Sequence, residues 1–222
     1  MPISNGEVFQ SLKGVLYPRV SGFSLNLGST GYGLFPISCV ECELDDATVA
    51  MLTEGRNANP QSFLTFFTAT NKRTKNWLVN GIGRDSNRIL FAIKSYETNR
   101  PYGYAGLIAN GIEHDCIEAD AIVRYQSQRI KGLMNAALLK LVFWSLNDLK
   151  RKEVVVRVLS DNPAVEFYRA CGFRDMKISP LFEERDRKGC LIALRENSEN
   201  GSLKPSRKTL SHLVFKSVEI KS

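Results

Sequence analysis

The fold of this chain is decided by one stretch, Val154-Val155-Val156-Arg157-Val158-Leu159-Ser160-Asp161-Asn162-Pro163-Ala164-Val165-Glu166-Phe167-Tyr168-Arg169-Ala170-Cys171-Gly172-Phe173. Its valine-rich start predicts a strand over residues 153–159. Asn162 is suited to cap a short helix that has Pro163 at its first position. Gly172 suits the left-handed conformation that ends such a helix. The stretch therefore predicts a strand, a polar turn and a short helix that carries Phe-Tyr.

A second informative region lies upstream of this stretch. Residues 117–125 are typical of a strand, and residues 133–149 predict a long helix that is apolar on more than one face. A strand, a helix and a second strand form a βαβ unit, which implies a parallel pair of strands with a right-handed crossover. Between the first strand and the helix runs the loop Arg129-Ile130-Lys131-Gly132-Leu133-Met134. Its glycine and the amides at the helix start could cradle a phosphate, although an ordinary βα turn has the same pattern.

The remaining elements follow from shorter patterns. Three segments are expected: an N-terminal extension at 1–35 whose structure the sequence leaves open, a domain at 36–195, and a polar, basic tail at 196–222. The tail is either mobile or forms a strand at 212–218. Within the domain, the patterns predict strands at 37–44 and 190–195, helices at 47–56 and 71–79, and a hairpin of strands 88–96 and 102–109.

Composition narrows the class of protein. The chain has 222 residues, of which 43% are hydrophobic and 24% charged, so it fits neither a disordered chain nor a disulfide scaffold. Its net charge of +7 favours an anionic partner, which could be nucleic acid, a membrane surface or a phosphate-rich small molecule. Seven basic and two acidic residues lie between Arg129 and Arg157, so five of these net charges fall in and after the loop.

The cysteines and apolar stretches indicate the compartment. The five cysteines are odd in number and scattered through apolar sequence, as free thiols in a reducing cytoplasm would be. Cys39-Val40-Glu41-Cys42 has C-x-x-C spacing, but no second pair completes a zinc site, so no metal is expected. The most apolar stretch, residues 133–146, is interrupted by polar residues and is shorter than the ~20 residues of a membrane crossing. We expect a cytoplasmic protein without a secretory signal or membrane anchor.

The stretch quoted first resembles the GNAT superfamily of acetyl-CoA-dependent N-acetyltransferases. The family signature N-x-x-A-x-x-F-Y-x-x-x-G-F is matched from Asn162 through Tyr168 to Gly172-Phe173, with Asn162 one place nearer the alanine. The family's pyrophosphate loop, Q/R-x-x-G-x-G/A, is matched by Arg129 and Gly132, whereas Met134 stands where a small residue is usual. The resemblance covers residues 37 to 195.

The resemblance implies an α/β fold with a central, mixed, mostly antiparallel sheet flanked by helices, in which the parallel pair at about 117–125 and 153–159 splays apart. Acetyl-CoA would lie in the resulting V, and no metal would be needed. The implied cofactor-binding residues are the backbone amides of the first strand, the phosphate loop, and two side chains of the second stretch. They are Ile122, Val123, Arg124, Arg129, Ile130, Lys131, Gly132, Leu133, Met134, Asn162 and Tyr168.

The chemistry implied is direct attack of an amine on the thioester. Tyr168 matches the family's general acid, which protonates the departing thiolate, and a core aromatic is the alternative reading. Glu118 and Asp120 lie on one face of their strand, so either could be the base if burial raised its pKa. His114 is a further candidate for the base. Tyr102, Tyr104 and His114 are candidate substrate contacts.

Residues 104–173 resemble a branch that acetylates nucleotide-linked amino sugars in surface-glycan pathways. The best interpretation is therefore a transferase that acetylates the amino group of a nucleotide sugar. Alternative acceptors are a protein or peptide amine, a polyamine or an antibiotic. A non-catalytic module that binds CoA or nucleic acid is a third reading, which the absence of dense basic clusters disfavours. An edge strand or the N-terminal extension could support a homodimer.

Overall fold

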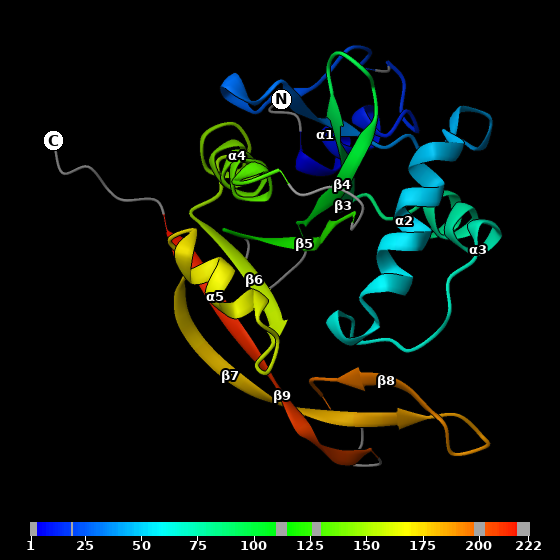
Figure 1. Ribbon diagram of the computed structural model, residues 1–222, viewed down its shortest axis with the longest axis vertical. Coiled ribbons are helices and arrows are strands. Elements are labelled where there is room, and N and C mark those ends of the chain that lie inside the picture. The colour runs from blue at the N-terminus through cyan, green and yellow to red at the C-terminus, as the bar shows by residue number, and fades with distance from the viewer. Residues whose placement is uncertain (1–3, 19, 110–114, 126–129, 198–202, 217–222) are drawn as a thin grey trace, which may run out of the picture.

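The structure is a computed structural model and describes residues 4–18, 20–109, 115–125, 130–197 and 203–216 (Figure 1). Its described strands form a single sheet in the order β1-β2-β3-β4-β5-β6-β9-β7-β8. Neighbouring strands are antiparallel except for β5 and β6, which are parallel. The strands are β1 (Leu25–Asn26), β2 (Tyr32–Pro36), β3 (Arg88–Ser95), β4 (Pro101–Ile108), β5 (Cys116–Arg124), β6 (Glu153–Leu159), β7 (Arg174–Arg185), β8 (Leu191–Arg195) and β9 (Lys204–Lys216).

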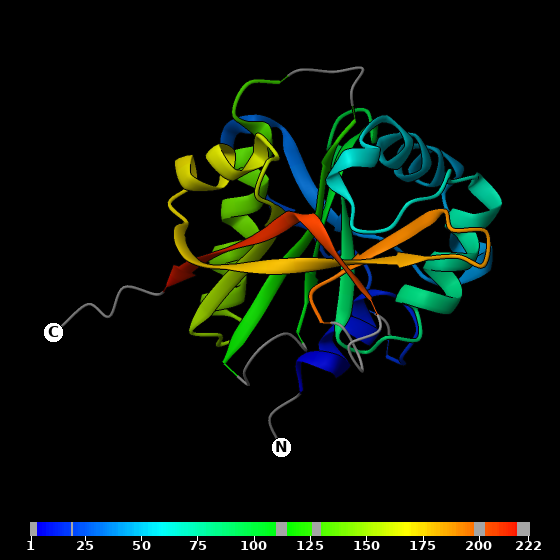
Figure 2. The same ribbon diagram turned by 90° about the horizontal axis from the view of Figure 1, so that it is seen from below.

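Helices cover both faces of this sheet. Figure 2 shows α4 and α5 on one side of the strands and α2 and α3 on the other. The helices are α1 (Asn5–Leu12), α2 (Asp46–Ala58), α3 (Asn71–Asn76), α4 (Leu133–Asn147) and α5 (Ala164–Ala170), and a π-helical turn, η4 (Trp77–Ile82), continues α3. Short 3₁₀ turns lie at Gly28–Thr30, Glu41–Glu43 and Pro60–Ser62. None of the helices in the described part of the chain has the length and apolar character needed to cross a membrane.

The alternation of side chains along the strands divides the core into two layers. On the α4 side, Phe91 and Val156 belong to the larger cluster, where the ring of Trp144 lies 5.7 Å from that of Phe91. On the α2 side, the neighbouring Leu90 packs with Leu52 in a second cluster. Successive residues of a strand point to opposite faces, so the central strands β3, β4 and β5 are buried on both faces.

The first 35 residues contribute to this core. Ser4 and Glu7 form a capping box that starts α1, and Phe9 of this helix is buried against Trp144 with 6.2 Å between ring centroids. The strand β2 pairs with β3 and runs across the proposed boundary at residue 35. Because β2 includes residues on both sides of residue 35, the sheet extends across the proposed boundary between the extension and the domain. The division of the chain into an extension, a domain and a tail remains a proposal.

Most predicted elements are confirmed, including the hairpin, the parallel pair and the helices at 47–56, 71–79 and 133–149. The predicted strand at 37–44 is wrong. The strand ends at Pro36, and a 3₁₀ turn at Glu41–Glu43 follows before Asp45 caps α2. Ile37 and Cys39 are apolar because they are buried beside α2, and a short apolar run does not distinguish this environment from a strand.

The polar C-terminal segment forms an inner strand of the sheet. Residues 204–216 form β9, which lies between β6 and β7 and pairs Val156 with Leu213. The alternative of a mobile tail is therefore wrong for these residues, and the strand expected at 212–218 begins at Lys204. The twelve-residue strand β7 was not expected, because it is largely exposed and Leu181 alone of its described side chains is fully buried.

Candidate functional site

The two parallel strands diverge after a short paired stretch. Their register pairs Cys116 with Glu153, Ile117 with Val154 and Glu118 with Val155. Beyond these pairs, β6 remains paired with β9 up to Leu159, and Figure 1 shows β5 turning away from it. The predicted splay is therefore confirmed. The resulting V leaves the β6-facing edge of the second half of β5 without a strand partner in the described structure.

A bulge bends β5 within the V. Gly106 pairs with Asp120 and Tyr104 with Val123, so β5 has one more residue than β4 between these pairs. Ala121 takes a positive φ of 53° there. A bulge of this kind leaves one residue unpaired and increases the local bend. The backbone at Ile122 and Val123, two of the predicted cofactor contacts, is consequently turned away from β6.

The predicted phosphate loop leads directly into α4. Gly132 has a φ of 80° and precedes Leu133, the first residue of the helix. A Cβ placed on Gly132 would meet nothing within 4 Å, so the turn is open rather than packed. No side chain in the described structure caps this helix. The first turn of α4 therefore presents backbone N–H groups and the positive end of the helix dipole to an anion.

Two side chains set the position of this loop. The amide of Ile130 donates to the Tyr102 hydroxyl at 2.7 Å, and Tyr102 is 1% exposed on β4. Met134 is partly buried against the larger core cluster, with its Sδ near Gly103 of β4. Its side chain is thus accommodated by the sheet rather than by the loop. Lys131 is exposed, and Arg129 lies outside the described residues.

Asn162 lies at the end of β6 and makes two hydrogen bonds. Its Oδ1 accepts from the Ala164 amide at 2.9 Å, as a capping side chain does, although the helix starts at Ala164 rather than at Pro163. Its Nδ2 donates to the Ser62 Oγ at 3.1 Å, which joins β6 to the segment after α2. Gly172 takes the expected left-handed conformation at the other end of α5, with a φ of 93°.

Tyr168 projects from α5 into the core on the α4 side. It is 8% exposed, and its ring contacts Phe167 and Phe173 with centroid distances of 5.4 and 6.0 Å. No described residue hydrogen-bonds its hydroxyl. Burial raises the pKa of Tyr168, and the nearby charge of Asp120 raises it further. The hydroxyl therefore keeps its proton at neutral pH, as a general acid must.

The two predicted carboxylates lie on the α2 side of β5, and each forms an ion pair. Glu118 is 5% exposed and accepts from Arg157 Nε at 2.9 Å, while Asp120 pairs with Arg88. Burial raises the pKa of Glu118, and this effect outweighs the hydrogen bond from Arg157. Of the two, Glu118 thus has the environment of a base that titrates above its ordinary range.

The ion pair of Glu118 continues into a network that the sequence does not reveal and that is buried at its two ends, Glu118 and His212. Arg157 Nη1 donates to Glu196 Oε2 at 2.6 Å, and Glu196 Oε1 lies 2.8 Å from His212 Nε2. His212 is 1% exposed, and its Nδ1 has no hydrogen-bond partner in the described structure. Burial lowers the pKa of His212. Only the pairing of β9 with β6, which sets His212 opposite Arg157, brings these residues together.

The predicted substrate contacts are separated by the fold. Tyr104 is 3% exposed and packs with Val123 in the α2-side cluster, where burial raises its pKa. Tyr102 faces the opposite side and binds the loop before α4. His114 lies outside the described residues.

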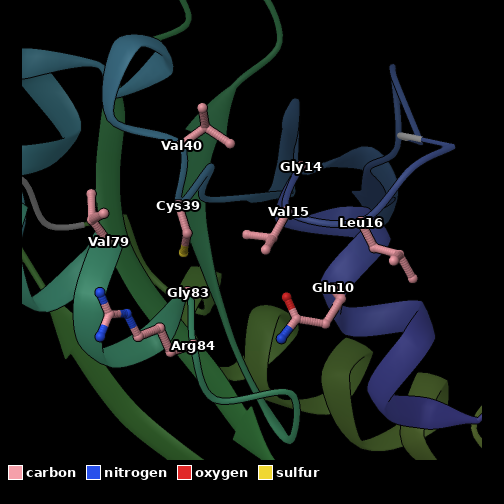
Figure 3. Close-up of a pocket in the computed structure, with 9 residues that line it drawn as sticks. All are labelled: Gln10, Gly14, Val15, Leu16, Cys39, Val40, Val79, Gly83 and Arg84. Carbon is pink, nitrogen blue, oxygen red and sulfur yellow. The ribbon is translucent and has the colours of Figure 1, made fainter.

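One cavity lies away from all of these residues. It lies beside α1 and η4, and Figure 3 shows the side chains that line it. Its volume is about 570 Å³. Its lining residues are Gln10, Gly14, Val15, Leu16, Cys39, Val40, Val79, Gly83 and Arg84. In the described part of the chain, no three His, Cys, Asp or Glu side chains are grouped to hold a metal ion, and Cys39 and Cys42 are free thiols.

The described fold has close parallels among solved structures. A GCN5-related N-acetyltransferase from Brucella melitensis superposes with a TM-score of 0.63 and 13% identity over 90% of this chain and 80% of that one. The chain has the GNAT fold. A Salmonella typhimurium acetyltransferase that modifies the N-terminal serine of ribosomal protein L7/L12 has a TM-score of 0.61, with 13% identity over 88% and 99% of the two chains.

A third parallel was solved with bound molecules. Spermidine N-acetyltransferase from Vibrio cholerae, in complex with CoA and spermine, has a TM-score of 0.60 and 16% identity over 85% and 96% of the two chains. No protein-family model and no curated protein matches the sequence. At these identities, the comparisons establish the GNAT fold of the chain. The reaction that it catalyses has to be argued from its own residues.

Proposed function

We propose that the protein is an N-acetyltransferase that transfers the acetyl group of acetyl-CoA to a primary amine. The acceptor that we propose is the amino group of a nucleotide-linked amino sugar. The observation that carries this proposal is the V between β5 and β6, together with the open turn at Gly132 before α4 and the buried Tyr168 on the α4 side of the sheet. The β5 edge offers backbone groups to an extended pantetheine arm, and the start of α4 offers amides to its pyrophosphate. The exposed Lys131, next to Gly132, adds a positive charge that suits these phosphates.

The proposed reaction is a direct attack in a ternary complex. The nitrogen of the neutral amine forms a bond to the thioester carbonyl carbon, and backbone N–H groups of β5 stabilise the oxyanion that develops. The C–S bond then breaks, and the thiolate takes the proton of the Tyr168 hydroxyl. The proton lost by the amine goes to a carboxylate, for which Glu118 is favoured over Asp120 because its burial raises its pKa. Glu118 then releases its proton to bulk water, and bulk water reprotonates Tyr168.

The nucleotide-sugar acceptor is the finer part of the proposal. It rests on the resemblance of residues 104–173 and on the basic character of the site. The solved relatives include enzymes whose acceptors are a protein N-terminus and a polyamine, so these are the acceptors to compare with it. We also propose a cytoplasmic location, on the ground that the cysteines read as free thiols in a reducing compartment.

The first test is stabilisation by acetyl-CoA. At a concentration of 100 times its Kd, a ligand that binds only the folded state adds about 2.7 kcal/mol to the free energy of unfolding. For a chain of this size that corresponds to a rise in Tm of about 5–10 °C. Acetyl-CoA at millimolar concentration should produce such a shift, and the absence of any shift would contradict the proposal.

The second test identifies the acceptor. Release of free CoA thiol should be followed with UDP- and dTDP-linked amino sugars, spermidine and short peptides. Turnover with an amino-sugar nucleotide, and loss of that turnover in Tyr168→Phe while acetyl-CoA still raises the Tm, is the expected result. Faster turnover with spermidine or a peptide would refute the proposed acceptor and support the proposed acetyltransferase activity.

A further inference from the structure

The last turns of α2, together with the segment that joins it to α3, span the open end of the V. At the end of β5, the Tyr125 hydroxyl donates to Glu54 Oε2 in the last turns of α2. At the end of β6, Asn162 Nδ2 donates to Ser62 Oγ. Both arms of the V therefore end against the chain between Glu54 and Ser62, and Arg56 lies within this span.

The same segment is fixed to the far edge of the sheet. Thr65 forms an antiparallel bridge with Ala193 of β8. The amide of Phe66 donates to the Ile192 carbonyl at 2.8 Å, and the amide of Leu194 donates to the Leu64 carbonyl at 2.7 Å. These backbone bonds hold residues 64–66 as an added strand, so the side chains around them have defined positions.

Two arginines stack on one aromatic ring of this segment. The guanidinium carbon of Arg56 lies 3.8 Å from the ring centroid of Phe67, and that of Arg73 lies 3.5 Å from the same centroid. Two guanidinium groups so close to one centroid require opposite faces of the ring. Arg56 also lies 4.3 Å from the centroid of Phe63 and donates from Nη2 to the carbonyl and hydroxyl of Thr65.

The charge of this stack is not neutralised. Neither Arg56 nor Arg73 forms an ion pair with a carboxylate in the described structure, and Arg56 Nε is buried without a hydrogen-bond partner. The positive charge of Arg73 lowers the pKa of Arg56, as does burial, which has the larger effect. Two like charges held on one ring are unfavourable by themselves. Since Arg56 Nη2 is used by Thr65 and its Nε is buried, the groups left for an anion are Arg56 Nη1 and the N–H edge of Arg73.

We propose that Arg56 and Arg73 bind a phosphate group of the acceptor, so that the enzyme selects small-molecule amines that carry a phosphate or diphosphate. The inference rests on the proposed function for the amine end of the molecule, where Glu118 and Asp120 lie on the same α2 side of the sheet. The acceptor would thus hold its ammonium group near the carboxylates and its phosphate at the arginine stack. Guanidinium groups bind phosphate with charge-assisted hydrogen bonds, and a phosphate or diphosphate has more acceptor oxygens for two guanidinium groups than a single carboxylate has. A polycationic amine would be repelled by the stack.

The test measures binding rather than turnover. Titration calorimetry with the full chain should compare UDP-glucosamine, free glucosamine and spermidine. Arg73→Gln removes an exposed side chain whose described contact is the ring, and Arg56→Lys keeps the charge but removes the planar fork. Lys72→Gln is the matched control, because it removes the same charge from an exposed neighbouring residue that has no ring contact in the described structure.

The wild type should bind UDP-glucosamine at least tenfold more tightly than glucosamine, and spermidine least. Arg73→Gln and Arg56→Lys should each weaken UDP-glucosamine binding at least tenfold, which is about 1.4 kcal/mol, and leave glucosamine unchanged. Lys72→Gln should stay within about twofold of the wild type, since removal of an exposed charge has small effects. A wild type that binds spermidine or free glucosamine more tightly than UDP-glucosamine would overturn the inference. Equal losses in Lys72→Gln and Arg73→Gln would overturn it as well.

The two proposals fail separately. One outcome is that acetyl-CoA does not raise the Tm, whereas UDP-glucosamine binds to the wild type and not to Arg73→Gln. This result would support the phosphate site and refute the proposed acetyltransferase function. If acetyl-CoA binds and thiol release occurs with amines that lack phosphate, at rates that Arg73→Gln leaves unchanged, the acetyltransferase stands and the phosphate site is refuted.

Discussion

Tyr102→Phe removes a single hydroxyl that holds the loop before α4. The Ile130 amide donates to this hydroxyl at 2.7 Å. The ring itself is 1% exposed and contacts that of Tyr32 with a centroid distance of 6.0 Å. The hydroxyl also donates to the Ile130 carbonyl at 3.4 Å. Phenylalanine keeps the ring in place, so the substitution isolates the contribution of this hydroxyl to the loop.

The expected cost follows from the exposure of the partner. A buried donor that loses its acceptor costs about 1–3 kcal/mol. Ile130 is 36% exposed, so water can reach this part of the chain, and we expect the lower end, about 1 kcal/mol. That cost corresponds to a fall in Tm of about 2–4 °C for a chain of this size. Because the loop loses its attachment to β4, the KM for acetyl-CoA should rise by about three- to tenfold, and the KM for the acceptor should not change.

Thermal unfolding and steady-state kinetics with each substrate varied will check this prediction. Tyr96→Phe is the control, because it removes a hydroxyl that bonds to Ser24 from a side chain that is 45% exposed. Its stability should change by less than about 0.5 kcal/mol. If Tyr102→Phe instead raised the KM for the acceptor and left both stability and the KM for acetyl-CoA unchanged, the hydroxyl would be a substrate contact and not a support for the loop.

Three further predictions concern the site and its surroundings. Tyr168→Phe should lower kcat by about 100-fold or more and leave acetyl-CoA binding unchanged, as expected for loss of a general acid. Because the pKa of Tyr168 is raised, its hydroxyl stays protonated between pH 7 and 9, and the wild-type kcat should not fall over this range. Burial lowers the pKa of His212 in the folded state, so the unfolded chain binds more protons as the pH falls through about 6.5. Urea unfolding should therefore show a loss of stability below that pH, and His212→Asn should remove this pH dependence. Gly132→Ala should lower the free energy of unfolding by about 1 kcal/mol, because a φ of 80° is unfavourable for a residue with a side chain, although no neighbouring atom obstructs a Cβ there. Titration calorimetry should show weaker acetyl-CoA binding in this variant. Unchanged binding would exclude the loop from the cofactor site.

Local patterns predict a large part of this fold. The strand at Glu153–Leu159, the helix that follows Gly132 and the hairpin of β3 and β4 each depend on residues close together in the sequence. Alternation of side chains and capping residues act within a few residues, so they can be read without knowledge of contacts. The same holds for the turn at Gly132 and for the position of Tyr168 on a short helix.

Other elements depend on partners far away in the chain. The strand β7 carries few buried side chains and is held by pairing with β9. In turn, β9 is polar at its start but pairs with β6 along its length. The prediction of a strand at residues 37 and 39 is wrong because apolar side chains occur both in strands and in irregular segments that pack against a helix such as α2.

The sequence by itself determined the βαβ unit, the glycine turn before α4 and the two carboxylates on one face of β5. These features follow from backbone conformation and from the period of side chains along one segment. Only the tertiary structure decided that Tyr102 supports the loop, that Arg157 links Glu118 to Glu196 and His212, and that Arg56 and Arg73 share the ring of Phe67. Each of these contacts joins segments whose approach is set by sheet order and helix packing, and no short-range pattern encodes that order.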